Sequence, residues 1–171
     1  MSKIIMYFSR SGNNYVNGKI QNLSVGNTEI AANILQKLTG ASLFKIEPVV
    51  AYSDDYSECI EEAKKDLQQR ARPELTAYPD SIAAYETIYL GYPNYWGTMP
   101  MAVFTLLEHF DFSGKTILPF CTHEGSGMGK SEADLKKVCP NAIIRKGLAI
   151  HGAFVNQSEE KIIEWIRRES K

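Results

Sequence analysis

Short apolar runs recur along the chain and are separated by stretches in which apolar residues return every three or four positions. The runs predict strands at residues 3–8, 41–47, 86–91, 115–121 and 142–150. The first run is continuously apolar, as in a strand that is buried on both faces of a parallel sheet. The second alternates between apolar and polar residues, which favours a place at the edge of the sheet.

Helical periodicity follows each predicted strand. It predicts helices at residues 27–39, 57–72, 100–110, 131–138 and 158–168. The first of these begins at Asn27 and ends at Gly40, a residue suited to a left-handed C-cap. The alternation of strands and helices indicates an α/β fold with a parallel sheet covered on both faces. We expect one domain, spanning residues 1–171.

Residues that can bind a ligand gather in three loops, each directly after a predicted strand. The loops are residues 9–14 together with 26–28, residues 92–98, and residues 122–127. In open parallel sheets, ligands bind outside the carboxyl ends of the strands, where such loops meet. The sequence therefore predicts one binding site built from all three loops.

The first loop has the features of an anion site. Its hydroxyl, amide and glycine positions are Ser9, Ser11, Gly12, Asn13, Gly26, Asn27 and Thr28. The helix that begins there presents unpaired N–H groups and the positive end of its dipole, so no lysine is needed. The same residue types would also serve a plain N-cap and two turns.

The second loop supplies flat aromatic surface, with Tyr95 and Trp96 between Pro93 and Gly97. The alternative is an ordinary strand-to-helix turn whose aromatic rings belong to the core. The third loop can direct backbone N–H groups toward the edge of a ring. A phosphate at one end and a flat heteroaromatic ring at the other describe a mononucleotide with a large ring.

Composition narrows the function classes. The 171 residues are 44% hydrophobic and 23% charged, with a net charge of -1. This balance gives no electrostatic footprint for nucleic acid or for an anionic membrane. The apolar run at the N-terminus is too short for a signal peptide or a membrane span. The three cysteines lack metal-ligand spacing, so we expect a reduced cytoplasmic protein without a metal site.

The chain resembles the flavodoxin-like family of FMN-binding proteins. Three segments carry the resemblance, Tyr7–Gly12 with the delayed Gly26–Thr28, then Gly91–Thr98, then Thr122–Gly127. The resemblance implies a three-layer α/β sandwich with strand order 2-1-3-4-5. It also implies FMN at the switch between strands one and three, as in flavodoxin itself.

The resemblance assigns a set of residues to FMN. They are Ser9, Arg10, Ser11, Gly12, Asn13, Asn27, Thr28, Pro93, Asn94, Tyr95, Trp96, Gly97, Thr98, Thr122, His123, Glu124, Gly125, Ser126 and Gly127. By this likeness Ser9, Ser11, Asn27 and Thr28 hold the phosphate. Trp96 or Tyr95 stacks on the isoalloxazine, and the third loop flanks the ring. Arg10 is interpreted as a side chain in solvent that uses only its N–H.

Two features depart from the family pattern. Residues 13–26 intervene between the first turn and its helix. The net charge of -1 is also less acidic than in flavodoxins that act as electron carriers.

Other nucleotide folds fit the sequence less well. Residues 124–131 nearly spell a P-loop, but Glu124 replaces its first glycine and no Walker-B aspartate follows an apolar strand. A receiver-type switch would need acids where the chain has Ser9 and Arg10. His109 and His151 are interpreted as structural, and His123 and Glu124 either tune the flavin or face solvent. No catalytic residue is assigned.

Two roles suit a flavin at this site, and a flavin-free binding module with the same fold is a minor alternative. An electron carrier would exchange electrons with a redox partner protein. An FMN-dependent reductase would take hydride from NAD(P)H and pass electrons to a quinone or another small acceptor. No nicotinamide-binding unit is recognisable, so electron transfer is narrowly favoured. Nucleic acid and membrane are not expected partners, and the oligomeric state stays open.

Overall fold

The computed structural model describes residues 2–171 and contains a parallel sheet of six strands. They are β1 (Ser2–Tyr7), β4 (Ser42–Lys45), β5 (Tyr85–Pro93), β6 (Thr116–His123), β7 (Ile143–Ile144) and β8 (Leu148–His151). The order is β4-β1-β5-β6, with both β7 and β8 paired to β6. If β7 and β8 are taken as one broken strand, this is the predicted order 2-1-3-4-5.

The fifth strand was predicted as one piece over residues 142–150, and that prediction was wrong. The ladder with β6 is interrupted between β7 and β8, where the Gly147 N–H donates to Glu132 Oε2 at 3.0 Å. A side chain at Gly147 would also meet the carbonyl oxygen of Pro119 at 3.1 Å. Between β7 and β8 the backbone therefore donates to the Glu132 side chain, and pairing with β6 resumes at Leu148.

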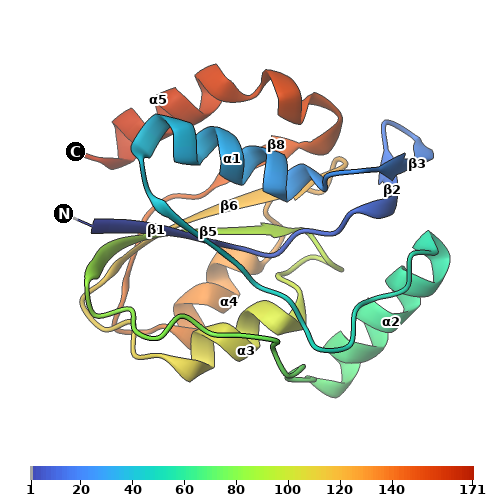
Figure 1. Ribbon diagram of the computed structural model, residues 1–171, viewed down its shortest axis with the longest axis horizontal. Coiled ribbons are helices and arrows are strands. Elements are labelled where there is room, and N and C mark those ends of the chain that lie inside the picture. Colours follow the sequence, from blue (N-terminus) through green and yellow to red (C-terminus); the bar gives the residue numbers. More distant parts are fainter. Residues whose placement is uncertain (1) are drawn as a thin grey trace.

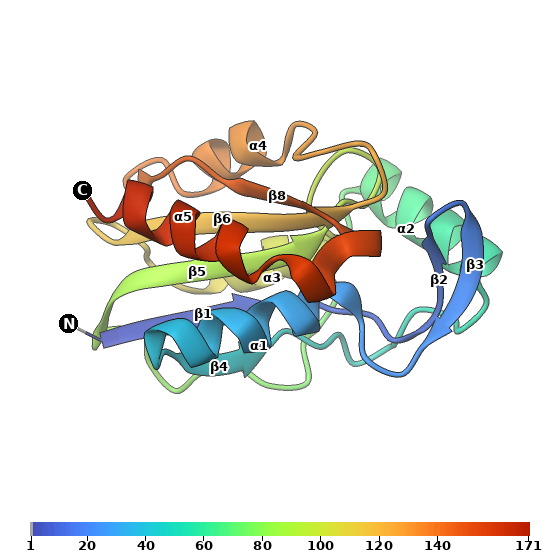
Figure 2. The ribbon, with the colours of Figure 1, turned by 90° about the horizontal axis from the view of Figure 1, so that it is seen from above.

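Helices cover both faces of the sheet, as Figures 1 and 2 show. On one face lie α1 (Asn27–Thr39) and α5 (Glu159–Glu169), and on the other lie α3 (Met101–His109) and α4 (Ser131–Val138). A short 3-10 helix, η1 (Gly152–Gln157), joins β8 to α5. The fifth α-helix, α2 (Tyr56–Gln69), lies toward the carboxyl ends of the strands.

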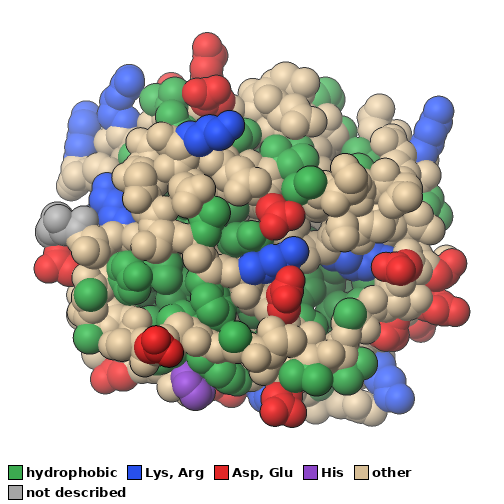
Figure 3. All heavy atoms as spheres, viewed as in Figure 1, with side chains coloured by type: hydrophobic (Ala, Val, Ile, Leu, Met, Phe, Trp, Pro, Cys, Tyr) green, Lys and Arg blue, Asp and Glu red, His purple; other side chains and the backbone are tan. Residues whose placement is uncertain are grey.

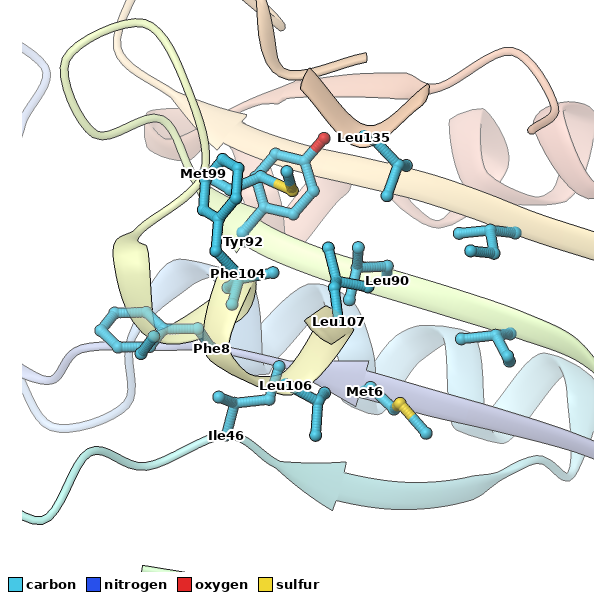
Figure 4. Close-up of a cluster of buried hydrophobic side chains, with 14 of the residues drawn as sticks. Met6, Phe8, Ile46, Leu90, Tyr92, Met99, Phe104, Leu106, Leu107 and Leu135 are labelled. Atoms are coloured by element: carbon cyan, nitrogen blue, oxygen red, sulfur yellow. The ribbon is translucent and has the colours of Figure 1, made fainter. Parts of the chain in front are cut away.

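The alternation of side chains along β1 produces two cores, one on each face of the sheet. Ile5 packs with Tyr89 and Trp165 beneath α1 and α5. Met6 belongs to the opposite cluster, which gathers side chains such as Leu90 from the sheet with α3 and α4 (Figure 4). Both faces of the central strands are thus buried, as the continuous apolar run predicted.

A β-hairpin occupies the segment that intervenes before α1. Its strands are β2 (Gly12–Val16) and β3 (Lys19–Leu23), which pair antiparallel and stay separate from the main sheet. Asn17 and Gly18 form the turn, with φ of 52° and 78°. Two positive φ values are the geometry of a type I′ turn, for which Asn-Gly is the preferred pair.

Within residues 2–171, no helix combines the length and apolarity that a membrane span requires.

Candidate functional site

A pocket of about 460 Å³ opens at the carboxyl ends of β1, β5 and β6. Residues from all three predicted loops line it. These are Ser9, Arg10, Asn27, Thr28, Pro93, Asn94, Tyr95, Trp96, Gly97, Thr122, His123, Glu124 and Ser126. The expectation that the three loops meet at one site is confirmed.

Six of the residues assigned to FMN do not line the pocket, and these are Ser11, Gly12, Asn13, Thr98, Gly125 and Gly127. Ser11 is exposed, and Gly12 and Asn13 belong to the hairpin ladder. Thr98 is buried and donates its hydroxyl to Asp134 Oδ2 at 2.6 Å. Gly127 uses its carbonyl to accept a hydrogen bond from Asn94.

The first turn of α1 closely approaches the end of β1. The N-cap is Gly26, where a Cβ would lie 2.3 Å from Ser9 Oγ and 2.6 Å from the Arg10 carbonyl oxygen. Ser9 Oγ accepts the N–H of Glu29 at 3.1 Å, so its own hydroxyl proton is free to be donated. The N–H groups at the start of a helix have no partner inside the helix, and here Asn27 and Thr28 at that start line the pocket.

The Thr28 side chain makes a contact that the sequence did not predict. Its hydroxyl is buried and lies 2.8 Å from the hydroxyl of Thr122 at the end of β6. This bond fixes the start of α1 to the neighbouring loop. Thr28 also lines the pocket.

Arg10 does not extend into solvent, and that interpretation was wrong. Its guanidinium donates to the carbonyl oxygens of Asn13 and, at 2.6 Å, of Ser53. The guanidinium fork supplies a donor to each of these two carbonyl groups. Arg10 lines the pocket, and its positive charge lies where the hairpin meets the segment before α2.

The aromatic loop is a tight turn in which Trp96 and Gly97 both have positive φ, 56° and 87°. Asn94 stabilises the turn, because its Oδ1 accepts the Gly97 N–H at 2.8 Å and its Nδ2 donates to the Gly127 carbonyl at 2.9 Å. The second and third loops are thereby joined. A non-glycine residue at positive φ is uncommon and costs free energy, which suggests that the position of the Trp96 ring matters.

The two aromatic candidates differ in how much of each ring is free. The Tyr95 ring packs edge-on against Phe8 and Tyr52, with centroid distances of 5.7 and 5.9 Å. Burial raises the pKa of Tyr95 well above its ordinary value. Trp96 is 46% exposed, while its Nε1 donates to the Ile60 carbonyl and the Lys64 ammonium lies 5.3 Å from the ring centroid. Trp96 is therefore the platform available to a ligand.

Two histidines and a glutamate lie together where the third loop meets the end of β8. The rings of His123 and His151 stack with centroids 5.5 Å apart, and His151 Nε2 lies 2.9 Å from Glu124 Oε2. Burial lowers the pKa of His123, and His151 lowers it further while Glu124 opposes the shift. The lowered pKa favours the neutral form of His123. His109 takes no part in this cluster. Its ring stacks on the ring of Tyr78, with centroids 3.9 Å apart.

One wall of the pocket escaped the sequence analysis. It consists of Asn14, Tyr15, Tyr56, Cys59, Ile60 and Ala63. The last four return every three or four positions along α2, an apolar stripe on a charged helix that could have indicated a covered face. Tyr15 comes from the hairpin and stacks on Tyr56, with centroids 6.0 Å apart and planes at 27°.

The described residues, 2–171, contain no candidate metal-binding cluster. No group of three or more His, Cys, Asp or Glu side chains there could hold a metal ion. All three cysteines are free and buried, and burial raises the pKa of each thiol. Raised thiol pKa values keep these cysteines in the unreactive protonated form.

The sheet order and the position of the pocket define a doubly wound α/β protein with a ligand site at its topological switch point. A family model described as flavodoxin matches residues 19–169. The chain belongs to the flavodoxin family. The matched range includes residues 26–28 of the first loop and begins after residues 9–14.

Solved structures agree with this assignment. A candidate flavoprotein from Bacteroides eggerthii is 25% identical, with a TM-score of 0.81 over 99% of this chain and 98% of its own. Another, from Bacteroides uniformis, is 27% identical, with a TM-score of 0.77 over 97% of each chain. A flavoprotein from Lactobacillus acidophilus in complex with FMN shares the fold, with 16% identity and a TM-score of 0.66 over 91% of this chain and 97% of its own. Among curated proteins, none matches the chain.

The buried contact between Thr28 and Thr122 leads to a prediction about stability. Thr28→Val and Thr122→Val should each lower the free energy of unfolding by about 1–3 kcal/mol, because each leaves one buried hydroxyl unpaired. The double substitution should cost less than the sum of the two, since no unpaired hydroxyl is left. Urea denaturation of the four proteins measures this, and strictly additive losses would contradict it.

Proposed function

We propose that the protein binds FMN non-covalently in this pocket and acts as an electron-transfer flavoprotein. The observation that carries the proposal is the pairing, in one pocket, of an anion site at the N-terminus of α1 with an exposed indole at Trp96. FMN has the matching chemistry, since a dianionic phosphate is joined to a flat apolar ring. The FMN complex of the Lactobacillus acidophilus relative is consistent with this choice.

The residues present fit the phosphate. The backbone N–H groups of Asn27 and Thr28 and the hydroxyl of Ser9 are the donors, and the helix dipole favours negative charge at this point. The Arg10 guanidinium adds a fixed positive charge at the rim. Together these residues bind and orient the phosphate end of the ligand.

The residues present also fit the ring. Trp96 offers the stacking surface, and residues 122–127 of the third loop supply backbone groups beside the ring edge. Tyr15, Tyr56 and Ile60 add apolar wall that limits access of water. When bound, FMN supplies the redox chemistry by accepting and releasing electrons, and the protein supplies binding, orientation and electrostatics.

The carrier role is favoured by the charge next to the pocket. The exposed side chains of Asp54, Asp55, Glu58 and Glu61 lie at the start of α2, whose inner face lines the pocket. In the space-filling view, acidic side chains gather at the edge where α2 lies in Figure 1 (Figure 3). A local acidic surface can steer a basic redox partner even when the net charge is -1. The buried, unpaired cysteines agree with action in the reducing cytoplasm.

A reductase with a small acceptor is the second candidate. The additional wall made by Tyr15, Tyr56 and Ile60 could take a flat molecule such as a quinone beside the flavin. This wall belongs to elements outside the three loops that the family resemblance uses.

Loss of the indole tests the assignment of the ring. Purified protein should be yellow and release FMN on boiling, and Trp96→Ala should weaken FMN binding fivefold or more, about 1 kcal/mol, through lost stacking and burial. Titration followed by flavin fluorescence measures the affinity. The control Trp165→Phe alters a buried ring on the far side of the sheet and should leave the affinity unchanged. A wild-type protein that stays colourless after incubation with FMN would end the proposal.

Comparison of FMN with riboflavin, which lacks the phosphate, tests the anion site. Ser9→Ala removes a hydroxyl donor next to the phosphate and should weaken FMN about tenfold, with a smaller effect on riboflavin. Ser126→Ala lies in the third loop, so any effect should be the same for both ligands. Equal losses for FMN and riboflavin in Ser9→Ala would place the phosphate elsewhere.

Anaerobic mixing with nicotinamides separates the two roles. We expect the absorbance of bound FMN to bleach slowly with NADH or NADPH and rapidly with a reduced flavoprotein reductase, because no nicotinamide-binding unit is recognisable. Stopped-flow absorbance in the flavin band measures both rates. Rapid bleaching by a nicotinamide, with turnover on added quinone, would instead establish the reductase.

A further inference from the structure

The β2–β3 hairpin reaches past the carboxyl ends of the main sheet and forms part of the pocket wall. In Figure 2 it stands beside α2, beyond the ends of β1, β5 and β6. Asn14 and Tyr15 from its first strand line the pocket. The second strand is almost entirely exposed, and within the hairpin Val16 alone is buried. Apart from Val16 and the stacking of Tyr15 on Tyr56, apolar contacts therefore contribute little to holding the hairpin in place.

Specific contacts at its base and its tip hold the hairpin instead. At the base, the Arg10 guanidinium donates to the Asn13 carbonyl, and Asn14 Nδ2 donates to the Arg10 carbonyl at 3.0 Å. At the tip, the N–H of Asn17 donates to Glu124 Oε2 at 3.1 Å. Glu124 belongs to the third loop, on a different side of the pocket. This single bond closes the wall between the hairpin and the third loop.

Glu124 is itself held in a defined position. The same Oε2 atom lies 2.9 Å from His151 Nε2, and the His151 ring is held between His123 and Phe154. A side chain at Gly152 would place a Cβ 2.6 Å from Glu124 Oε1, so glycine there makes room for the carboxylate. Glu124 thus projects from a packed site toward the hairpin tip.

One oxygen of the Glu124 carboxylate is left without a hydrogen bond. Among the described residues 2–171, Glu124 Oε1 is buried and has no hydrogen-bond partner. A buried acceptor without a donor is unfavourable, so both useful contacts of this side chain are made by Oε2. The free-energy cost of leaving Oε1 unpaired is explained if the bond between Oε2 and the Asn17 N–H helps to form the pocket wall.

We propose that Glu124 is a positioning residue, which fixes the hairpin tip at Asn17 so that Asn14 and Tyr15 enclose the bound flavin and slow its release. The identity of the ligand rests on the proposed function, while the attachment of the hairpin does not. Asn14 and Tyr15 contact the flavin once it has bound. The rate constant of release therefore depends on Glu124, and the rate constant of association much less.

Hydrogen exchange tests the attachment without any flavin. In Glu124→Ala, amide exchange within residues 12–23 should become about tenfold faster, because the acceptor of the Asn17 N–H is lost. Glu124→Gln keeps an acceptor oxygen and should restore part of the protection. The matched control is Glu132→Ala, which also removes a bond from glutamate Oε2 to a remote backbone N–H, that of Gly147. This control should leave exchange in the hairpin unchanged.

Flavin release tests the consequence. The rate constant for FMN release from Glu124→Ala, followed by the rise in flavin fluorescence after dilution, should increase about tenfold with little change in association. Exchange in β1 and β5 reports whether the fold is intact, and Glu124→Met replaces Glu124→Ala if the smaller side chain impairs folding. Unchanged hairpin exchange, or faster exchange with unchanged release, would overturn the proposal. If wild-type protein binds no FMN, the proposed function fails and the exchange data alone decide whether Glu124 holds the hairpin.

Discussion

The close approach of α1 to the ends of β1 and β6 is the constraint on which the pocket depends. Gly26 allows the helix to begin against Ser9 and Arg10, where any Cβ would collide at 2.3 Å. The buried bond between Thr28 and Thr122 then fixes that helix start to the loop after β6. Because both contacts act at the first turn of α1, they determine where its free N–H groups point. The end of β1 and the start of the third loop are both held against that turn.

Much of the fold could be predicted because parallel sheets leave strong patterns. Within residues 3–8, the five apolar residues 4–8 predicted a strand buried on both faces, and all five are buried. The break between β7 and β8 could not be predicted in the same way. It depends on a contact between Gly147 and Glu132, and hydrophobic periodicity carries no information about contacts between residues far apart in the sequence.

The site could be predicted by location more readily than by role. Loop positions follow from strand ends, so most of the three loops do line the pocket. The roles of Arg10 and Thr28 depend on partners from other segments, Ser53 and Thr122, which only the folded chain brings near. The Asn17-Gly18 pair is a local sequence signal for a hairpin turn. The flanking strands are mostly polar and contain one buried residue, so no hydrophobic periodicity indicated that they were strands.

The two ends of the hairpin lie opposite each other, because Gly12 pairs with Leu23 in the ladder. The insertion therefore leaves the framework and returns to it at nearly the same place. Its length and sequence can change without altering the distance that the framework must bridge. The segment from residue 13 to 22 is in this sense an exchangeable module, in which variation can accumulate or be introduced by grafting. Replacement of this segment would change the pocket wall made by Asn14 and Tyr15 while the sheet and the start of α1 stay unchanged.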